Sequence, residues 1–382
     1  RLKGTKGSNV KLGIKRRGQN NLLNFTVTRG DIPVNSVKAS YMVNKEIGYI
    51  QIDKFGETTY PEMLIALAKL NQMDFKGLII DLRGNTGGYM GAAIQMVNEF
   101  LPSNRLIVYT QGRKSPREEY KSDGRGSYQD LPLVVLVDEG SASASEIFAG
   151  AIQDNDRGII IGRRSFGKGL VQQQLPFGDG SAIRLTVARY YTPSGRCVQK
   201  AYEMGDKEAY AKDVLNRLNG GELTNVDSMK AHIPDSLKYK TLRQGRTVYG
   251  GGGITPDYFI PLDTAQYTKF YREISAKSVI INTNLRYLDK NRKKLSKQYP
   301  TFEKFDAEFD VPDQLVETLF ENAAKEKVTP KDEAERQETV PQVKRMLKAL
   351  IARDLWDMSE YFRVMNETSE TVQAALKELN LQ

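Results

Sequence analysis

Residues 131–162 read LPLVVLVDEGSASASEIFAGAIQDNDRGIIIG, and this stretch decides the fold. Residues 131–138 form an almost continuous apolar run, which predicts a buried strand. A helix is predicted over about 143–154, and residues 158–162 are predicted to form a second buried strand. Strands rich in Val and Ile that alternate with helices are typical of an α/β core, in which helices cover a sheet.

The same alternation continues on both sides of this stretch. Apolar or alternating segments predict further strands at 47–55, 77–82, 106–110, 171–176 and 182–190. Helical spacing of apolar residues follows the first two of these strands. We therefore predict a layered α/β core with a mixed sheet and flanking helices over residues 38–261.

The two ends of the chain and one internal stretch differ from this core. Residues 1–37 contain two alternating segments, 9–15 and 23–28, separated by a polar turn, which predicts a hairpin. Residues 199–245 are polar without strong periodicity, and we interpret them as an insertion. Residues 262–382 have helical spacing of apolar residues, which predicts a mainly α-helical C-terminal extension.

Two residue counts exclude whole classes of site. The chain of 382 residues has one histidine, His232, and one cysteine, Cys197. A single cysteine excludes an intrachain disulfide and a Cys-rich metal site, and a single histidine excludes the two-His metal motifs. A Ser–His mechanism would have only one possible base. If the chain is an enzyme, we expect carboxylates, lysines or backbone groups to perform its chemistry.

The net charge favours no particular partner. Lys and Arg number 56 against 47 Asp and Glu, which gives +9. The densest basic run, 290–297, lacks interleaved aromatic residues and is typical of a solvated helix face, so we expect no nucleic-acid partner. No apolar run approaches the ~18 residues of a membrane span. The chain begins at Arg1 inside a segment with strand character, so we expect the native N-terminus to be missing.

Residues 138–174 hold the candidate chemistry, and the residues alone leave three interpretations open. The first is a phosphate-binding loop, because residues 162–168 match G-x-x-x-x-G-K. However, Gly169 stands where Ser or Thr would hold Mg²⁺, and an alternating segment follows instead of a helix. The second is S-x-x-K at Ser165 to Lys168, where flanking glycines weaken the helical turn that this motif needs.

The third interpretation is a serine nucleophile at Ser143 with Lys168 as its base. Ser143 lies where a strand and turn lead into a helix, so the amide of Ala144 would be free to stabilise an oxyanion. Ser143 to Glu146 is also a capping box, which needs no catalysis. Spacing alone favours the capping box over the nucleophile.

A resemblance to a known family decides between these interpretations. The segments SASASEIFAGAIQD and FGKGLVQQ resemble the signature of the C-terminal processing peptidases, the tail-specific S41-type serine peptidases with a Ser–Lys dyad. The resemblance implies Ser143 as nucleophile, Lys168 as base, Gln172 as a catalytic support and Asp154 as a supporting residue. The flanking blocks agree, and they are GYIQIDKF at 48–55, DLRGNTGG at 81–88, YYTPSGR at 190–196 and GGGGITPD at 250–257.

General physical chemistry supports a catalytic role more readily for Lys168 than for Asp154. Lysine has an ordinary pKa near 10.4 and serves as a base at neutral pH only under apolar cover, which the strand at 158–162 could supply. Asp154 would lie about 16 Å along the helix axis from Ser143, so we expect a structural role for it. For the second oxyanion donor we expect the amide of Gly87 or Gly88, since glycine lets a peptide approach closely.

The resemblance also implies a biological setting. We expect a serine endopeptidase that cleaves protein or peptide substrates at or near exposed C-terminal tails, outside the cytoplasm in the periplasm or cell envelope, without metal or other cofactor. Residues 1–37 resemble the end of a PDZ domain. The resemblance is also compatible with association with the envelope and with a homo-oligomer. His232 is expected to be a surface loop residue. The alternative is a non-catalytic peptide-binding or assembly module on the same fold.

Overall fold

The computed structural model describes residues 2–16, 19–32, 34–201, 207–225, 234–263 and 267–380. The chain divides into two compact units, Arg1–Asn35 and Ser36–Gln382. The first unit contains an antiparallel hairpin of β1 (Asn9–Ile14) and β2 (Leu23–Thr28), where the alternating segments predict it. That this hairpin is the end of a PDZ domain stays a prediction.

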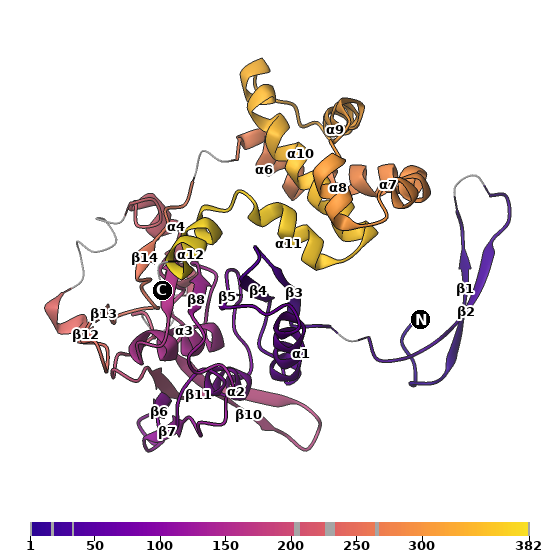
Figure 1. Ribbon diagram of the computed structural model, residues 1–382. Coiled ribbons are helices and arrows are strands. Elements are labelled where there is room, and N and C mark those ends of the chain that lie inside the picture. The colour runs from indigo at the N-terminus through magenta and orange to yellow at the C-terminus, as the bar shows by residue number, and fades with distance from the viewer. Residues whose placement is uncertain are drawn as a thin grey trace. The chain divides into compact units, whose positions relative to one another are not determined.

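A six-stranded mixed sheet forms the centre of the second unit (Figure 1). Its strands, in spatial order, are β14 (Tyr258–Phe259), β9 (Ile159–Gly162), β8 (Leu133–Val137), β5 (Gly77–Asp81), β4 (Ile47–Ile52) and β3 (Val37–Met42). Only β3 is antiparallel to its neighbour, and the other strands are parallel. The continuous apolar runs in the sequence are the central strands, because parallel strands are buried on both faces.

Helices cover both faces of this sheet. The helices α1 (Thr59–Asn71), α2 (Met90–Asn98) and α3 (Ala144–Asp154) pack on the face that includes Ile50 and Ile80. The opposite face, which includes Tyr49 and Ile79, packs against α12 (Glu370–Leu379). Successive strand residues point to opposite faces, so each strand contributes to both cores. The structure confirms the predicted layered α/β fold.

A second, antiparallel sheet carries the hairpin that borders the candidate site. Its strands in order are β10 (Leu170–Pro176), β11 (Ala182–Tyr191), β6 (Leu106–Gln111) and β7 (Glu118–Lys121). A register shift between Val171 and Gln172 marks an irregularity in β10. In the part of the chain that the structure describes, no strand pairs with the outer edge of β10.

The polar stretch at 199–245 contains regular structure. It holds α4 (Lys207–Asn219) and the short helix η1 (Asp235–Leu237). The strand β12 (Lys238–Lys240) pairs with β13 (Thr247–Tyr249), just beyond the predicted end of this stretch. That the stretch is an insertion stays a prediction.

The C-terminal region is helical, as its periodicity predicts. Its helices are α6 (Lys269–Ala276), α7 (Val279–Gln298), α8 (Phe302–Glu308), α9 (Asp313–Lys325), α10 (Glu333–Leu355), α11 (Met358–Asn366) and α12. Residues such as Phe270, Phe305 and Leu350 form a separate hydrophobic core among α6 to α11. The last helix, α12, instead packs on the central sheet. Within the ranges described above, no helix is both long and apolar enough to cross a membrane.

Glu360, in the first turn of α11, gives folding stability a specific pH dependence. Burial and a side-chain hydrogen bond with Asp357 raise the pKa of Glu360 from 4.5 to about 7. A carboxyl whose pKa is raised on folding stabilises the fold at low pH, and this contribution is lost as pH rises through about 7. We expect Glu360→Gln to have little effect at pH 5 and to increase stability relative to the parent at pH 8, as measured by urea unfolding.

The exposed Glu321 on α9 provides the control for this prediction. Glu321→Gln should change the unfolding midpoint little at either pH. An equal effect of Glu360→Gln at pH 5 and pH 8 would show that Glu360 does not titrate differently in the folded chain.

Candidate active site

Ser143 occupies a strained backbone position immediately before α3. Its φ of 55° and ψ of −110° lie outside the regions that a non-glycine residue ordinarily adopts. Such a conformation costs about 1–3 kcal/mol and persists only where surrounding contacts hold it. Here Ser143 N donates to Glu146 Oε2 at 2.8 Å, and Ser143 O accepts from the amides of Glu146 and Ile147. Strain of this kind is a reason to consider a functional role.

The buried carboxylate of Glu146 joins the Ser143 turn to the loop that carries Lys168. Its Oε2 accepts from the amides of Ser143 and Lys168, both at 2.8 Å. Its Oε1 accepts from Ser165 Oγ at 2.5 Å and from Gly167 N at 2.7 Å. Burial raises the pKa of Glu146, and these four hydrogen bonds oppose that rise. The predicted capping box is present, and its carboxylate also positions the lysine loop.

The turn after β5 lies directly against Ser143. A Cβ on Gly87, whose φ is 93°, would lie 2.7 Å from Ser143 Cβ and 2.8 Å from Ala144 N. A Cβ on Gly88, whose φ is 145°, would lie 2.0 Å from Phe55 O. Only glycine fits these two positions without a shift of the backbone.

The backbone amides of this turn differ in their partners. Gly87 N donates to Asn85 Oδ1 at 2.8 Å, so this amide is already engaged. Across the described residues, the amides of Gly88 and Ala144 donate no hydrogen bond. Asn85 O accepts from Ala142 N at 2.9 Å and from Ser145 Oγ at 2.8 Å, which fixes the turn against the start of α3. Of the three amides expected to bind an oxyanion, only that of Gly87 already has a hydrogen-bond acceptor among the described residues.

One cavity of about 430 Å³ brings most of the predicted residues together. Its lining residues are Thr86, Gly87, Gly88, Ser143, Lys168, Leu170, Gln172, Gln174, Arg184 and Tyr190. Ser143 is almost buried, Lys168 is half-buried and Gln172 is exposed. No hydrogen bond joins Lys168 Nζ to Ser143 Oγ among the contacts of the described residues. Burial raises the pKa of the Tyr190 phenol, and a side-chain hydrogen bond with Ser143 opposes this rise.

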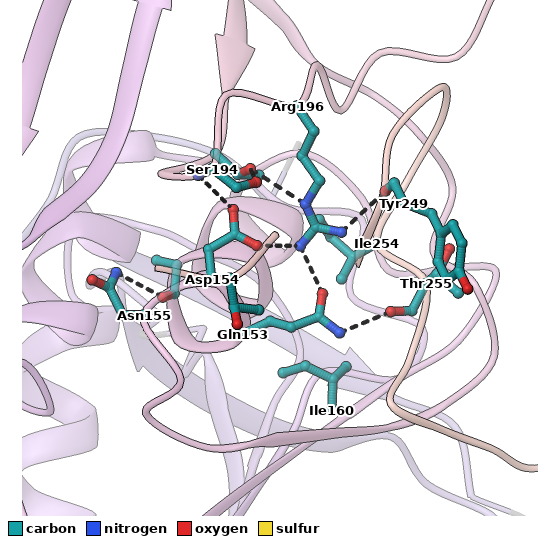
Figure 2. A network of polar contacts seen from close by, with 12 residues as sticks. Gln153, Asp154, Asn155, Ile160, Ser194, Arg196, Tyr249, Ile254 and Thr255 are labelled. Atoms are coloured by element: carbon teal, nitrogen blue, oxygen red, sulfur yellow. Dashed lines mark hydrogen bonds and ion pairs between the residues drawn. The ribbon is translucent and has the colours of Figure 1, made fainter. Parts of the chain in front are cut away.

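Asp154 lies at the other end of α3 and does not line this cavity. Its Oδ1 forms an ion pair with Arg196 Nη2 at 2.7 Å, and its Oδ2 accepts from Ser194 N at 2.9 Å (Figure 2). The side chains of Asp154 and Arg196 are 0% and 1% exposed. The guanidinium also donates to Gln153 Oε1 and to Tyr249 O. These contacts connect α3 to the turn after β11.

The sequence assigned no role in this site to Glu146, Tyr190 and Arg184, nor to the lining residues Thr86, Leu170 and Gln174. Glu146 was visible as part of a capping box, but its spacing gave no sign that it also binds the lysine loop. Tyr190 belongs to the YYTPSGR block, which could have pointed to it. Arg184 lies in an alternating strand, where no local pattern distinguishes a cavity-facing arginine from a solvated one.

Other candidate groups add nothing to the site. No cluster of three or more His, Cys, Asp or Glu side chains suited to a metal ion occurs in the part of the chain that the structure describes. Cys197 is a free, partly buried thiol. His232, expected to be a surface loop residue, lies outside the described residues.

Comparison with known proteins assigns a family to the region that holds this cavity. Residues 46–205 match the model of peptidase family S41. This region belongs to that family. Residues 270–357, beyond the S41 region, match a family of unknown function (DUF8443).

Several curated relatives of this chain are named processing proteases. A carboxyl-terminal-processing protease of Synechocystis sp. is 39% identical over 54% of this chain and 49% of its own length. A carboxy-terminal-processing protease of Bartonella bacilliformis is 41% identical over 52% of this chain and 46% of its own length. The solved structure of a photosystem II D1 C-terminal processing protease is 32% identical, with a TM-score of 0.40, over 51% of this chain and 54% of that one. The chain thus spans about half the length of the curated relatives it matches.

Proposed function

We propose that this chain is a serine endopeptidase that cleaves protein substrates at or near exposed C-terminal tails by a Ser–Lys dyad. The observation that carries the proposal is the cavity, which is lined by Ser143, Lys168 and Gly88 together. The strained backbone at Ser143 and the S41 membership of residues 46–205 support it. The curated relatives named above, which are C-terminal processing proteases, support the preference for tails.

Acylation would begin with attack of Ser143 Oγ on the carbonyl carbon of the scissile bond. Lys168 Nζ would accept the hydroxyl proton and return it to the leaving amine as the peptide bond breaks. The amides of Ala144 and Gly88 would donate hydrogen bonds to the oxyanion, at the N-terminus of α3, where the helix dipole favours negative charge. A water molecule, deprotonated by Lys168, would then hydrolyse the acyl-enzyme.

This reaction would require the amine of Lys168 and the side-chain amide of Gln172 to lie close to Ser143. The flexible lysine side chain can turn toward Ser143 by rotation about its side-chain bonds, while its backbone stays bound to Glu146. Gln172 lines the same cavity from β10, and its neutral amide could orient the amine without favouring the charged form. Asp154 would support the fold of α3, not the chemistry.

The setting of the reaction is also a proposal. We propose that the protein acts outside the cytoplasm, in the periplasm or at the cell envelope. The hairpin of β1 and β2 would be the last part of a PDZ domain that binds substrate tails by strand addition. Association with the envelope and assembly into homo-oligomers are compatible with this setting.

Covalent labelling tests the assignment of the nucleophile. The intact chain should degrade casein and take up one equivalent of a fluorophosphonate, with the adduct on the tryptic peptide that contains Ser143. Ser143→Ala should lose both properties, whereas Ser103→Ala, at an exposed serine, should keep both.

The alternative function gives a different result in the same experiment. A chain that leaves casein intact and takes up no label, yet binds peptides, would be a peptide-binding or assembly module on a peptidase fold. Labelling at a serine other than Ser143 would overturn the assignment of the nucleophile.

A further inference from the structure

Arg184 lies on the face of the β10–β11 hairpin that borders the candidate active site. In the register of the hairpin, Arg184 is opposite Gln174, and Thr186 is opposite Gln172. Side chains two residues apart on a strand point to the same face, so Gln172 and Gln174 share a face. Arg184 joins these two glutamines in lining the cavity that contains Ser143.

The charges around this cavity are unbalanced. Its lining includes two cationic side chains, Lys168 and Arg184, and no carboxylate. Arg184 donates to Gln174 Oε1 at 3.3 Å, a neutral acceptor, and forms no ion pair with any residue that the structure describes. A guanidinium does not lose its charge in proteins, so Arg184 carries a permanent positive charge in the cavity lining.

Several arginines of the same peptidase region pair with carboxylates, whereas exposed arginines such as Arg189 form no ion pair with a described residue. Arg163 pairs with Glu139 at 2.6 Å and Arg164 with Glu222 at 2.7 Å, both close to the lysine loop in sequence. Arg196 pairs with Asp154 in the interior. Arg184 differs from the three paired arginines in having no acidic partner among the described residues, and it differs from Arg189 in lining the cavity.

We propose that Arg184 is a specificity-determining residue that binds a carboxylate of the substrate. The proposal rests on the proposed peptidase function of the same cavity. The planar guanidinium presents paired N–H donors that match the two oxygens of a carboxylate. At about 3.3 Å per strand residue, Gln174 lies about 7 Å beyond Gln172, which corresponds to two residues of an extended substrate.

A polypeptide can supply this carboxylate in two ways. One source is the α-carboxylate of the last residue, when cleavage occurs close to the C-terminus. The other is the side chain of Asp or Glu near the scissile bond. Both sources present the same anionic group to Arg184, so peptides that differ in only one of them are needed to tell them apart.

The test compares quenched fluorescent peptides that differ only in this charge. One pair has a free or an amidated C-terminus, and a second set has Glu, Gln or Lys at each position around the scissile bond. The variants are Arg184→Gln and Arg184→Glu. Arg189→Gln is the matched control, because Arg189 is an exposed arginine on the same strand that does not line the cavity.

We expect the parent chain to cleave the carboxylate peptide about three- to fivefold faster in kcat/KM than its amide counterpart, the scale of a solvent-accessible ion pair. Arg184→Gln should abolish this preference, and Arg184→Glu should favour the lysine peptide instead. Arg189→Gln should retain the parent's preference. The set of peptides whose preference is lost in Arg184→Gln shows whether the carboxylate comes from the C-terminus or from an Asp or Glu side chain. An unchanged preference in Arg184→Gln would overturn the proposal.

Peptide binding separates failure of this proposal from failure of the peptidase function. Fluorescence anisotropy with Ser143→Ala measures binding without turnover. Tighter binding of the carboxylate peptide that depends on Arg184 supports the inference even if no chain cleaves any peptide. The inference would be contradicted, even if casein is degraded, by equal binding of every carboxylate peptide and its amide counterpart. This equality would have to hold for Ser143→Ala and for the double variant Ser143→Ala/Arg184→Gln.

Discussion

Replacing Lys168 with alanine is expected to lower kcat/KM by about 10³-fold, the usual contribution of a general base. Without Nζ, nothing in the described cavity lining has an amine that could accept the proton of Ser143. The fold should persist, because Glu146 binds the backbone amide of Lys168 and alanine retains that amide. Kinetics on a fluorescent peptide and thermal unfolding measure the two effects separately.

Lys168→Arg distinguishes a base from a simple positive charge. Arginine keeps the charge but does not deprotonate in proteins, so this variant should be as inactive as Lys168→Ala. Lys114→Ala, at an exposed lysine, serves as the control and should behave like the parent. Substantial activity in Lys168→Arg would rule out Lys168 as the base, and another group would have to activate Ser143.

Replacing Asp154 with alanine should lower the free energy of unfolding by about 3–5 kcal/mol, because it leaves the buried guanidinium of Arg196 without its ionic partner. The double variant Asp154→Ala/Arg196→Met should be less destabilised than the sum of its single variants, since it removes both charges. Urea unfolding measures all three. The control is the exposed ion pair of Lys238 and Asp235, where Lys238→Met should leave the unfolding midpoint close to that of the parent.

The same variant distinguishes a structural from a catalytic Asp154. At a temperature where Asp154→Ala remains folded, its kcat should stay close to that of the parent, because Asp154 does not line the cavity. Normal stability with a large loss of kcat would instead place Asp154 in the catalytic machinery.

The fold of the central region could be predicted from sequence because burial leaves a local pattern. The apolar run before Asp138 and the run in 158–162 became β8 and β9. The position of α12 had no such pattern. Its apolar spacing indicated an amphipathic helix, but the partner of that face, the sheet surface around Tyr49 and Ile79, lies some 300 residues away in the chain. Periodicity shows that a face is buried, not which surface buries it.

The sequence by itself determined the α/β core, because burial leaves a local residue pattern, and it offered Ser143 and Lys168 as a candidate pair through the resemblance of their flanking segments to a peptidase family. Only the tertiary structure decided how the surrounding groups are used. It engages Gly87 N with Asn85, gives Gly88 N no acceptor among the described residues, and places Arg184 in the cavity lining. It also makes Glu146 the link between the serine turn and the lysine loop. These roles depend on hydrogen bonds and close approaches between segments distant in sequence, which exist only once the chain has folded.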